Sequence, residues 1–163
     1  MEINMPEELK HPFFFPNEKF HLKTDNDANT PFFYEVLFFS DKEGLKPWEK
    51  PEETVSALLE DWTILKEEIR SLFEKRNKDL IPDLMRKGIS YFIELLYWSN
   101  EQPSVLSPRI YYDKLPIKPV NIEERLEFII SRPNLFHSFM QLSELIIEQE
   151  KGFKKALAIK KCK

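Results

Sequence analysis

The side chains best suited to chemistry lie in the last long segment of the chain, where four polar residues repeat at helical spacing. They fall at i, i+4, i+7 and i+11: His137, Gln141, Glu144 and Glu148. This spacing places all four on one side of a helix. A histidine and two carboxylates could hold a metal ion or perform acid–base chemistry.

A metal site in a helix bundle needs matching ligands from a facing helix. The other expected helices offer acidic residues and no second histidine: Asp61, Glu67, Glu68 and Glu94. We therefore interpret the stripe as solvated or partner-facing, and we predict neither a metal nor a cofactor. No serine or cysteine stands beside an evident base, so no catalytic residue is predicted.

Three arginines offer a second kind of site. Arg125 and Arg132 lie seven residues apart on one expected helix, and with Arg109 they could form a cationic pocket for a carboxylate or a phosphate. The alternative, which we favour, pairs them with Glu123, Glu127 or the glutamates of the last helix. From both patterns we predict an interaction face of five residues: Arg125, Arg132, His137, Gln141 and Glu144.

A basic segment closes the sequence. Residues 151–163 hold six lysines and no acid, so the first 150 residues carry −10 to give the overall charge of −4. Lysines interleaved with apolar residues are typical of an arm that contacts nucleic acid or an anionic membrane surface. Lysines also suit a helix C-terminus, and an acidic body repels phosphate backbones. The basic tail comprises Lys151, Lys154, Lys155, Lys160, Lys161 and Lys163.

The composition excludes several classes of protein. Three scattered glycines supply no loop to wrap a phosphate and few of the tight turns that an all-β fold needs. The single cysteine, Cys162, allows no internal disulfide and fits a reducing compartment. No apolar run approaches the roughly 20 residues of a membrane span, and the N-terminus lacks the pattern of a signal peptide. We expect a cytoplasmic protein.

Apolar residues at spacings of three and four predict four long helices that position these side chains. The first two cover residues 52–77 and 79–99, with Asp79 as a cap. The second is apolar nearly all round and should lie at the centre of the bundle, where Gly88 allows close approach of a neighbour. A third begins at a capping signature, Asn121 with Glu124, and a fourth runs from about residue 134 to at least residue 150.

The N-terminal third holds eight of the fourteen phenylalanines, three of them in HPFFFP at residues 11–16. Leaving so much aromatic surface exposed would be costly. We therefore expect a single all-α domain, with residues 1–50 wrapping a bundle at residues 51–160. Residues 31–41 could be helical or extended. The proline-rich residues 100–120 should form an irregular strap over a helix end, using Val105, Leu106, Ile110, Tyr111 and Ile117.

Three stretches, HPFFFP, LLYWSNEQPSV and KPVNIEERLEFIISRPNLFHSFMQLSELIIEQEK, resemble the YpoC-like family of small proteins from Bacillus and related bacteria. The resemblance implies a helical, cytoplasmic protein whose gene lies near DNA replication and repair genes. It carries no active-site residues, so the sites above rest on this chain alone.

The leading functional hypothesis is a non-catalytic protein–protein interaction module with an unidentified protein partner. The alternative is a nucleic-acid-associated accessory protein that uses the basic tail. A third hypothesis is a small-molecule or metal enzyme centred on His137.

Overall fold

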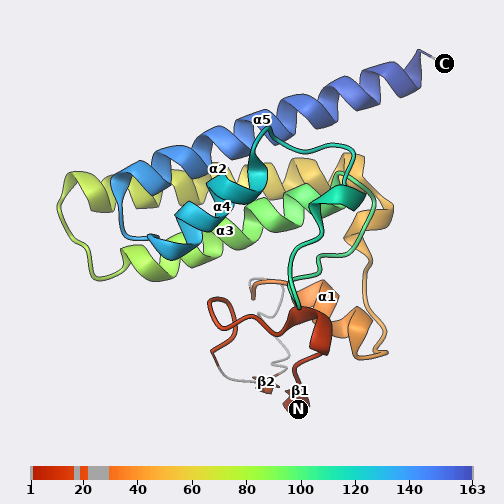
Figure 1. The fold of residues 1–163 in the computed structure, drawn as a ribbon, viewed down its shortest axis with the longest axis horizontal. Coiled ribbons are helices and arrows are strands. Elements are labelled where there is room, and N and C mark those ends of the chain that lie inside the picture. Colours follow the sequence, from red (N-terminus) through yellow and green to blue (C-terminus); the bar gives the residue numbers. More distant parts are fainter. Residues whose placement is uncertain (1, 17–18, 22–29, 163) are drawn as a thin grey trace.

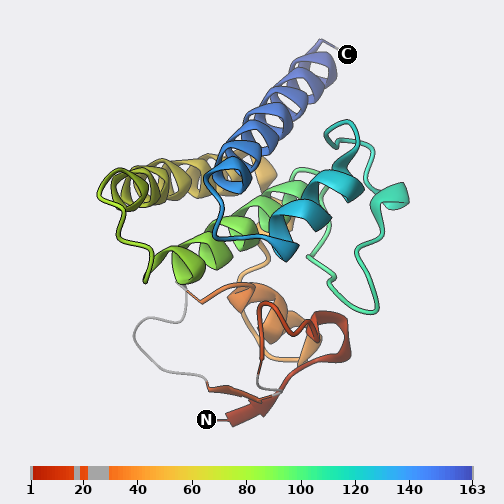
Figure 2. The same cartoon turned by 60° about the vertical axis from the view of Figure 1, so that its left-hand side comes forward.

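Helices dominate the computed structural model, which describes residues 2–16, 19–21 and 30–162. The principal elements are α2 (Pro51–Glu74), α3 (Ile81–Trp98), α4 (Ile122–Ser131) and α5 (Phe136–Lys161). Figures 1 and 2 show α5 on one side of the α2–α3 pair and the N-terminal segments on the opposite side. The all-α class is confirmed, and the last helix extends well beyond residue 150.

α3 lies at the centre of the bundle, as its apolar composition predicts. Twelve of its eighteen residues are buried, so the helix is covered on most sides, and it packs against both α2 and α5. A Cβ atom at Gly88 would lie 3.0 Å from Trp62 of α2 and 3.1 Å from Leu142 of α5. The lack of a side chain at Gly88 therefore allows these two neighbours to approach α3 closely.

The expected N-terminal caps do not form. α3 begins at Ile81 after Leu80, and α4 begins after Asn121, with no side-chain cap in either case. A capping side chain normally requires an extended N-cap residue, whereas Asn121 is left-handed with φ of 55°. Asn121 therefore turns the chain into α4, a role that asparagine tolerates well. Asp79 lies one residue too early to cap α3.

Two long helices end in a left-handed turn without glycine. α2 ends at Glu74, and Arg76 follows with φ of 57°. The backbone N–H of Asn77 donates to Leu72 O at 3.0 Å, and that of Arg76 donates to Phe73 O at 3.2 Å, which is a Schellman motif. Glu101, with φ of 59°, does the same after α3. Both helices therefore end without the glycine that this turn usually contains.

The N-terminal layer contains short elements that the sequence analysis did not predict. They are β1 (Glu2–Asn4), η1 (Glu7–Leu9), β2 (Lys19–His21) and η3 (Pro47–Glu49). β1 and β2 pair antiparallel, with Ile3 opposite Phe20. Three-residue strands are too short to show an alternating pattern. Residues 31–41, which the pattern left open, form the helix α1 (Phe33–Phe39).

The aromatic residues of this layer are partly in the core. Phe14 is 5% exposed and Phe32 fully buried, and their rings meet edge to face at 5.2 Å. Phe38, by contrast, is 37% exposed, and the side chain of Phe20 lies outside the described part. The layer is tied to α3 because Arg86 Nε donates to the backbone O of Phe13 at 2.8 Å.

Residues 100–120 cross the C-terminal end of α3 and the middle of α5. Asn100 Nδ2 donates to Ile117 O at 2.7 Å, and Ile117 N donates to Asn100 Oδ1 at 2.8 Å. Gln149 Nε2 of α5 also donates to Ile117 O, at 3.0 Å. Of the predicted covering residues, Leu106 is buried, Tyr111 is exposed, and the others are half-buried. Leu115, which was not predicted, is fully buried.

Candidate functional site

The predicted interaction face lies where α4 meets α5, and its first arginine is ion-paired. Arg125 Nη1 lies 2.6 Å from Glu148 Oε2 of α5 and donates to Val120 O at 3.0 Å. This is the pairing with a last-helix glutamate that the sequence favoured. Arg109 lies elsewhere, over the ring of Tyr111 at 5.1 Å. The cationic pocket of three arginines therefore does not form.

Arg132 and His137 meet on one aromatic ring. The Arg132 guanidinium lies 5.3 Å from the centroid of Phe128, and the His137 ring meets Phe128 edge to face at 5.4 Å. Sequence reasoning named both polar residues and missed the phenylalanine between them. The available signal was spacing, because Phe128 precedes Arg132 by four residues and so shares its side of α4.

Gln141 and Glu144 continue the face along α5. Gln141 is half-buried and Glu144 is exposed. No hydrogen bond or ion pair is formed by either side chain with the residues that the structure describes. Both lie on the side of α5 that carries His137, so the expected common stripe is present. The part of it nearest α4 is taken up by the Arg125–Glu148 pair.

An apolar stripe runs beside this polar one and was missed in the sequence. Phe136, Met140 and Ile147 are 48%, 43% and 45% exposed, and the preceding Leu135 is 45% exposed. The spacing of four and seven residues places the three helical side chains on one side of α5. Leu135 precedes the first turn of α5 as its N-cap, so it lies at the start of this stripe and outside the helix.

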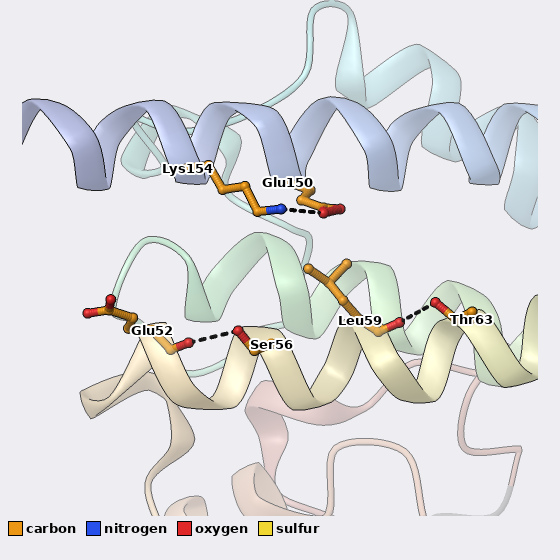
Figure 3. Close-up of polar contacts among 6 residues, drawn as sticks. All are labelled: Glu52, Ser56, Leu59, Thr63, Glu150 and Lys154. Carbon is orange, nitrogen blue, oxygen red and sulfur yellow. Dashed lines mark hydrogen bonds and ion pairs between the residues drawn. The ribbon is translucent and has the colours of Figure 1, made fainter.

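The basic tail is the last part of α5, and two of its lysines are paired. Lys154 Nζ lies 2.9 Å from Glu150 Oε1 within α5, and Lys161 Nζ lies 2.9 Å from Glu52 Oε1 at the start of α2. Figure 3 shows the Lys154–Glu150 pair beside α2, where Ser56 and Thr63 donate to backbone oxygens of their own helix. Lys151, Lys155 and Lys160 are exposed, and Lys163 lies outside the described residues.

Two further features concern the other hypotheses. Within the described ranges, no three His, Cys, Asp or Glu side chains are grouped to hold a metal ion, and His137 itself is exposed. None of the helices described is long and apolar enough to cross a membrane.

A pocket that the sequence analysis did not identify lies between α2, α3 and the N-terminal layer. Its volume is about 690 Å³, within the roughly 300–1,000 Å³ of small-molecule sites. We call it the acidic pocket. The residues that characterise it are Tyr34, Leu58, Asp61, Tyr91, Glu94 and Trp98.

Two carboxyl groups are buried at or next to the acidic pocket. Glu94 lines it and is 6% exposed, while Glu35 of α1 lies behind it and is fully buried. Glu35 Oε2 accepts hydrogen bonds from Trp98 Nε1 at 2.9 Å and from Ser104 N at 3.1 Å. Burial raises the pKa of both carboxyl groups, and the charge of Glu35 further raises the pKa of Glu94.

Both buried carboxyl groups had a signal in the sequence. Each is a single acid in an otherwise apolar or aromatic run, Glu35 in PFFYEVLFF and Glu94 in ISYFIELLYW. An acidic residue inside a helix that is apolar nearly all round must be buried or must line a cavity. Asp61 and Glu94 were considered as metal ligands for His137, whereas the structure places both at a pocket that no residue of α5 lines.

Comparisons with known proteins cover most of the chain. A model of the YpoC-like protein family matches residues 52–161, which extend from the start of α2 to the end of α5. A Bacillus subtilis (strain 168) protein described as uncharacterized protein YpoC is 34% identical over 120 residues, which make up 72% of this chain and 73% of that relative. No solved structure gives a significant match.

Proposed function

The chain belongs to the YpoC-like family, and we propose that it is a non-catalytic protein–protein interaction module that binds its partner through the corner of α4 and α5. The observation that carries the proposal is the apolar stripe of Phe136, Met140 and Ile147, each more than 40% exposed, beside the Arg132–Phe128–His137 stack. We call this combined surface the α4–α5 face.

The composition of the α4–α5 face matches that of protein interfaces. Aromatic residues, methionine and arginine are enriched at interfaces, and a few such residues account for most of the binding energy. Three large apolar side chains that are partly exposed to water on one side of a helix are a cost that docking would remove.

Arg132 indicates what the partner should present. Its guanidinium is stacked on Phe128, and within the described ranges no carboxylate lies at ion-pair distance from it. A stacked arginine still has N–H donors at its edge, and these suit a carboxylate. We therefore propose a partner with an apolar patch flanked by an acidic side chain.

The proposal places the protein in the cytoplasm, since its one cysteine, Cys162, is an exposed free thiol and such thiols persist in a reducing compartment. The alternative function, contact with nucleic acid, would use the exposed Lys151, Lys155 and Lys160. Two other lysines of the tail are already paired with glutamates, which leaves less charge for phosphate groups. It predicts binding that weakens steeply with salt.

The test is capture of partners by the tagged full-length chain from nuclease-treated bacterial extract. The variant Met140→Glu/Ile147→Glu should reduce the amount of captured partner at least tenfold, and Arg132→Glu should do so as well. Ile64→Glu is the matched control, because Ile64 is 64% exposed on α2 and lies outside the α4–α5 face. All of these side chains are exposed, so the melting temperatures should stay close to that of the wild type.

Equal capture by the double variant and by the wild type would contradict the proposed face. Partners that disappear after nuclease treatment would favour the nucleic-acid alternative.

A further inference from the structure

The acidic pocket has a buried floor and a charged, exposed rim. Leu58, Glu94 and Trp98 form the floor at 7%, 6% and 4% exposure. Glu49, Glu53 and Asp61 on the rim are exposed. A ligand that entered would therefore leave water on reaching Glu94 and would keep its outer end near the acidic rim.

Carboxylates line this pocket from two helices. Asp61 of α2 and Glu94 of α3 both line it. In the part of the chain that the structure describes, neither carboxyl group has an ion-pair partner. Glu94 is buried, and a buried carboxyl group normally has a compensating partner, so the pocket offers an unused acceptor for a group with N–H donors.

Aromatic rings form much of the remaining wall. Tyr34, Tyr91 and Trp98 line the pocket, and the rings of Tyr34 and Trp98 meet edge to face at 6.3 Å. The hydrogen bond from Trp98 Nε1 to Glu35 fixes the orientation of the indole. Aromatic rings attract cations through their faces, and indole is the strongest of them. The walls therefore favour an organic cation over a bare metal ion.

Two lysines also line the rim, but they do not cancel its negative charge. Lys46 and Lys50 are exposed, and the Lys46 ammonium lies 5.6 Å from the centroid of Phe38, a ring that is not among the pocket-lining residues. Four acidic residues line the pocket with these two lysines: Glu49, Glu53, Asp61 and Glu94.

We propose that the acidic pocket binds a small organic amine, whose ammonium group lies between Asp61 and Glu94 and whose apolar body packs against Tyr34, Tyr91 and Trp98. The ammonium group supplies the N–H donors that both carboxylates lack. This site is separate from the α4–α5 face.

Binding of the amine should be coupled to release of a proton. Four titratable groups interact with Glu94, namely Glu35 and Tyr34 of α1, Asp61 of α2 and Tyr91 of α3. The other charged residues that line the pocket are Lys46, Glu49, Lys50 and Glu53. Burial and the nearby acidic charges raise the pKa of Glu94, so the free pocket favours the protonated form of this carboxyl group. An ammonium group favours the carboxylate, and affinity should therefore increase as pH rises from about 5 to 8.

The test uses benzylamine as the probe, with benzyl alcohol as a neutral analogue of the same shape. Titration of the full-length protein followed by NMR should give saturable binding of benzylamine, at least tenfold tighter than that of benzyl alcohol, with shifts centred on Trp98. Calorimetry in buffers of different ionisation enthalpy should detect the released proton.

Variants distinguish binding of the amine in the pocket from a general attraction of cations to an acidic protein. Asp61→Asn and Glu94→Gln should each weaken the binding of benzylamine at least tenfold, and Glu94→Gln should also abolish the release of a proton on binding. Glu60→Gln is the matched control, because it removes the same charge from an exposed position of α2 outside the pocket, and it should bind as the wild type does. Equal affinity for the amine and the alcohol, or equal weakening by Glu60→Gln, would overturn the proposal.

Discussion

Glu35 and Glu94 are carboxyl groups that the fold buries beside aromatic side chains. A buried carboxylate is costly, so such groups keep their proton to a higher pH than in the unfolded chain. The hydrogen bonds from Trp98 and Ser104 to Glu35 offset part of this effect without reversing it. Because both pKa values are raised in the folded protein, the stability of the fold depends on pH in a definite direction.

We predict that the free energy of unfolding decreases as pH rises above the ordinary carboxyl pKa of 4.5. In that range the unfolded chain has released protons that the folded chain still holds, so added base favours unfolding. Each such group contributes a slope of up to about 1.4 kcal/mol per pH unit until the pH passes its folded pKa. Urea denaturation at pH 5, 6, 7 and 8 measures the slope.

Glu94→Gln should make this slope shallower and raise the stability at pH 8 relative to the wild type, because an amide needs no proton to stay neutral. Glu60→Gln changes an exposed acid on α2 and should leave the slope unchanged. Parallel profiles for the wild type and Glu94→Gln would show that Glu94 is already ionised in the folded state.

Three helices are followed by a residue whose backbone conformation is unfavourable for any amino acid except glycine. Asp41, Arg76 and Glu101 follow α1, α2 and α3 with φ between 56° and 59°, in the left-handed region that glycine adopts most readily. All three glycines of the chain lie elsewhere, and none has a positive φ. Each of these helix ends therefore carries a conformational cost of roughly 1–2 kcal/mol.

Arg76→Gly should stabilise the protein by about 1 kcal/mol, because the relief of the left-handed cost exceeds the entropy that glycine loses on folding. Lys75→Gly, one residue earlier, is the matched control. Lys75 has a right-handed conformation, with φ of −82°, so glycine there should destabilise by roughly 0.5–1 kcal/mol. Thermal and urea denaturation of both variants check the signs. Destabilisation by Arg76→Gly would mean that the arginine side chain itself stabilises the turn.

The helices could be predicted from the sequence more readily than the helix ends and the candidate sites. The spacing of apolar residues is a local property, so it located α2 and the central helix α3 correctly. The conformations of Asn121 and Arg76 depend on where the chain must go next, which tertiary packing decides. The acidic pocket was missed for a related reason, since Asp61 and Glu94 meet only when α2 packs against α3. The stack on Phe128 likewise requires α4 and α5 to meet.

On the scale of the whole molecule, the N-terminal layer is connected to the bundle at several separate points. The backbone O of Glu8 accepts hydrogen bonds from Leu106 N at 2.7 Å and Ser107 N at 3.0 Å. Glu35 accepts one from Trp98, and Phe32 is fully buried in the core. The family model begins at residue 52 and so excludes this layer. Whether the matched helices fold without this layer depends on how much its contacts contribute to the free energy of unfolding.

We predict that deletion of residues 1–40 destabilises the protein strongly. The deletion removes the buried Met5, Leu9, Phe14 and Phe32, which leaves part of the α3 surface in water, and it removes the acceptors of the Trp98 and Leu106 N–H groups. Each fully buried apolar side chain contributes about 1.5–3 kcal/mol, so the loss is large beside a typical total stability of roughly 5–15 kcal/mol. The truncated protein should melt at a much lower temperature or show no cooperative transition.

Point variants in the full-length chain test the same idea without truncation. Phe32→Ala should cost about 3–5 kcal/mol, as for a phenylalanine removed from a core, whereas Phe38→Ala should cost much less, because Phe38 is 37% exposed. Urea denaturation measures both values. If the truncated protein melts at the wild-type temperature, or if the two substitutions cost the same, the N-terminal layer does not stabilise the bundle. Residues 41–163 would then fold without this layer, and the acidic pocket would lack Tyr34 from its wall.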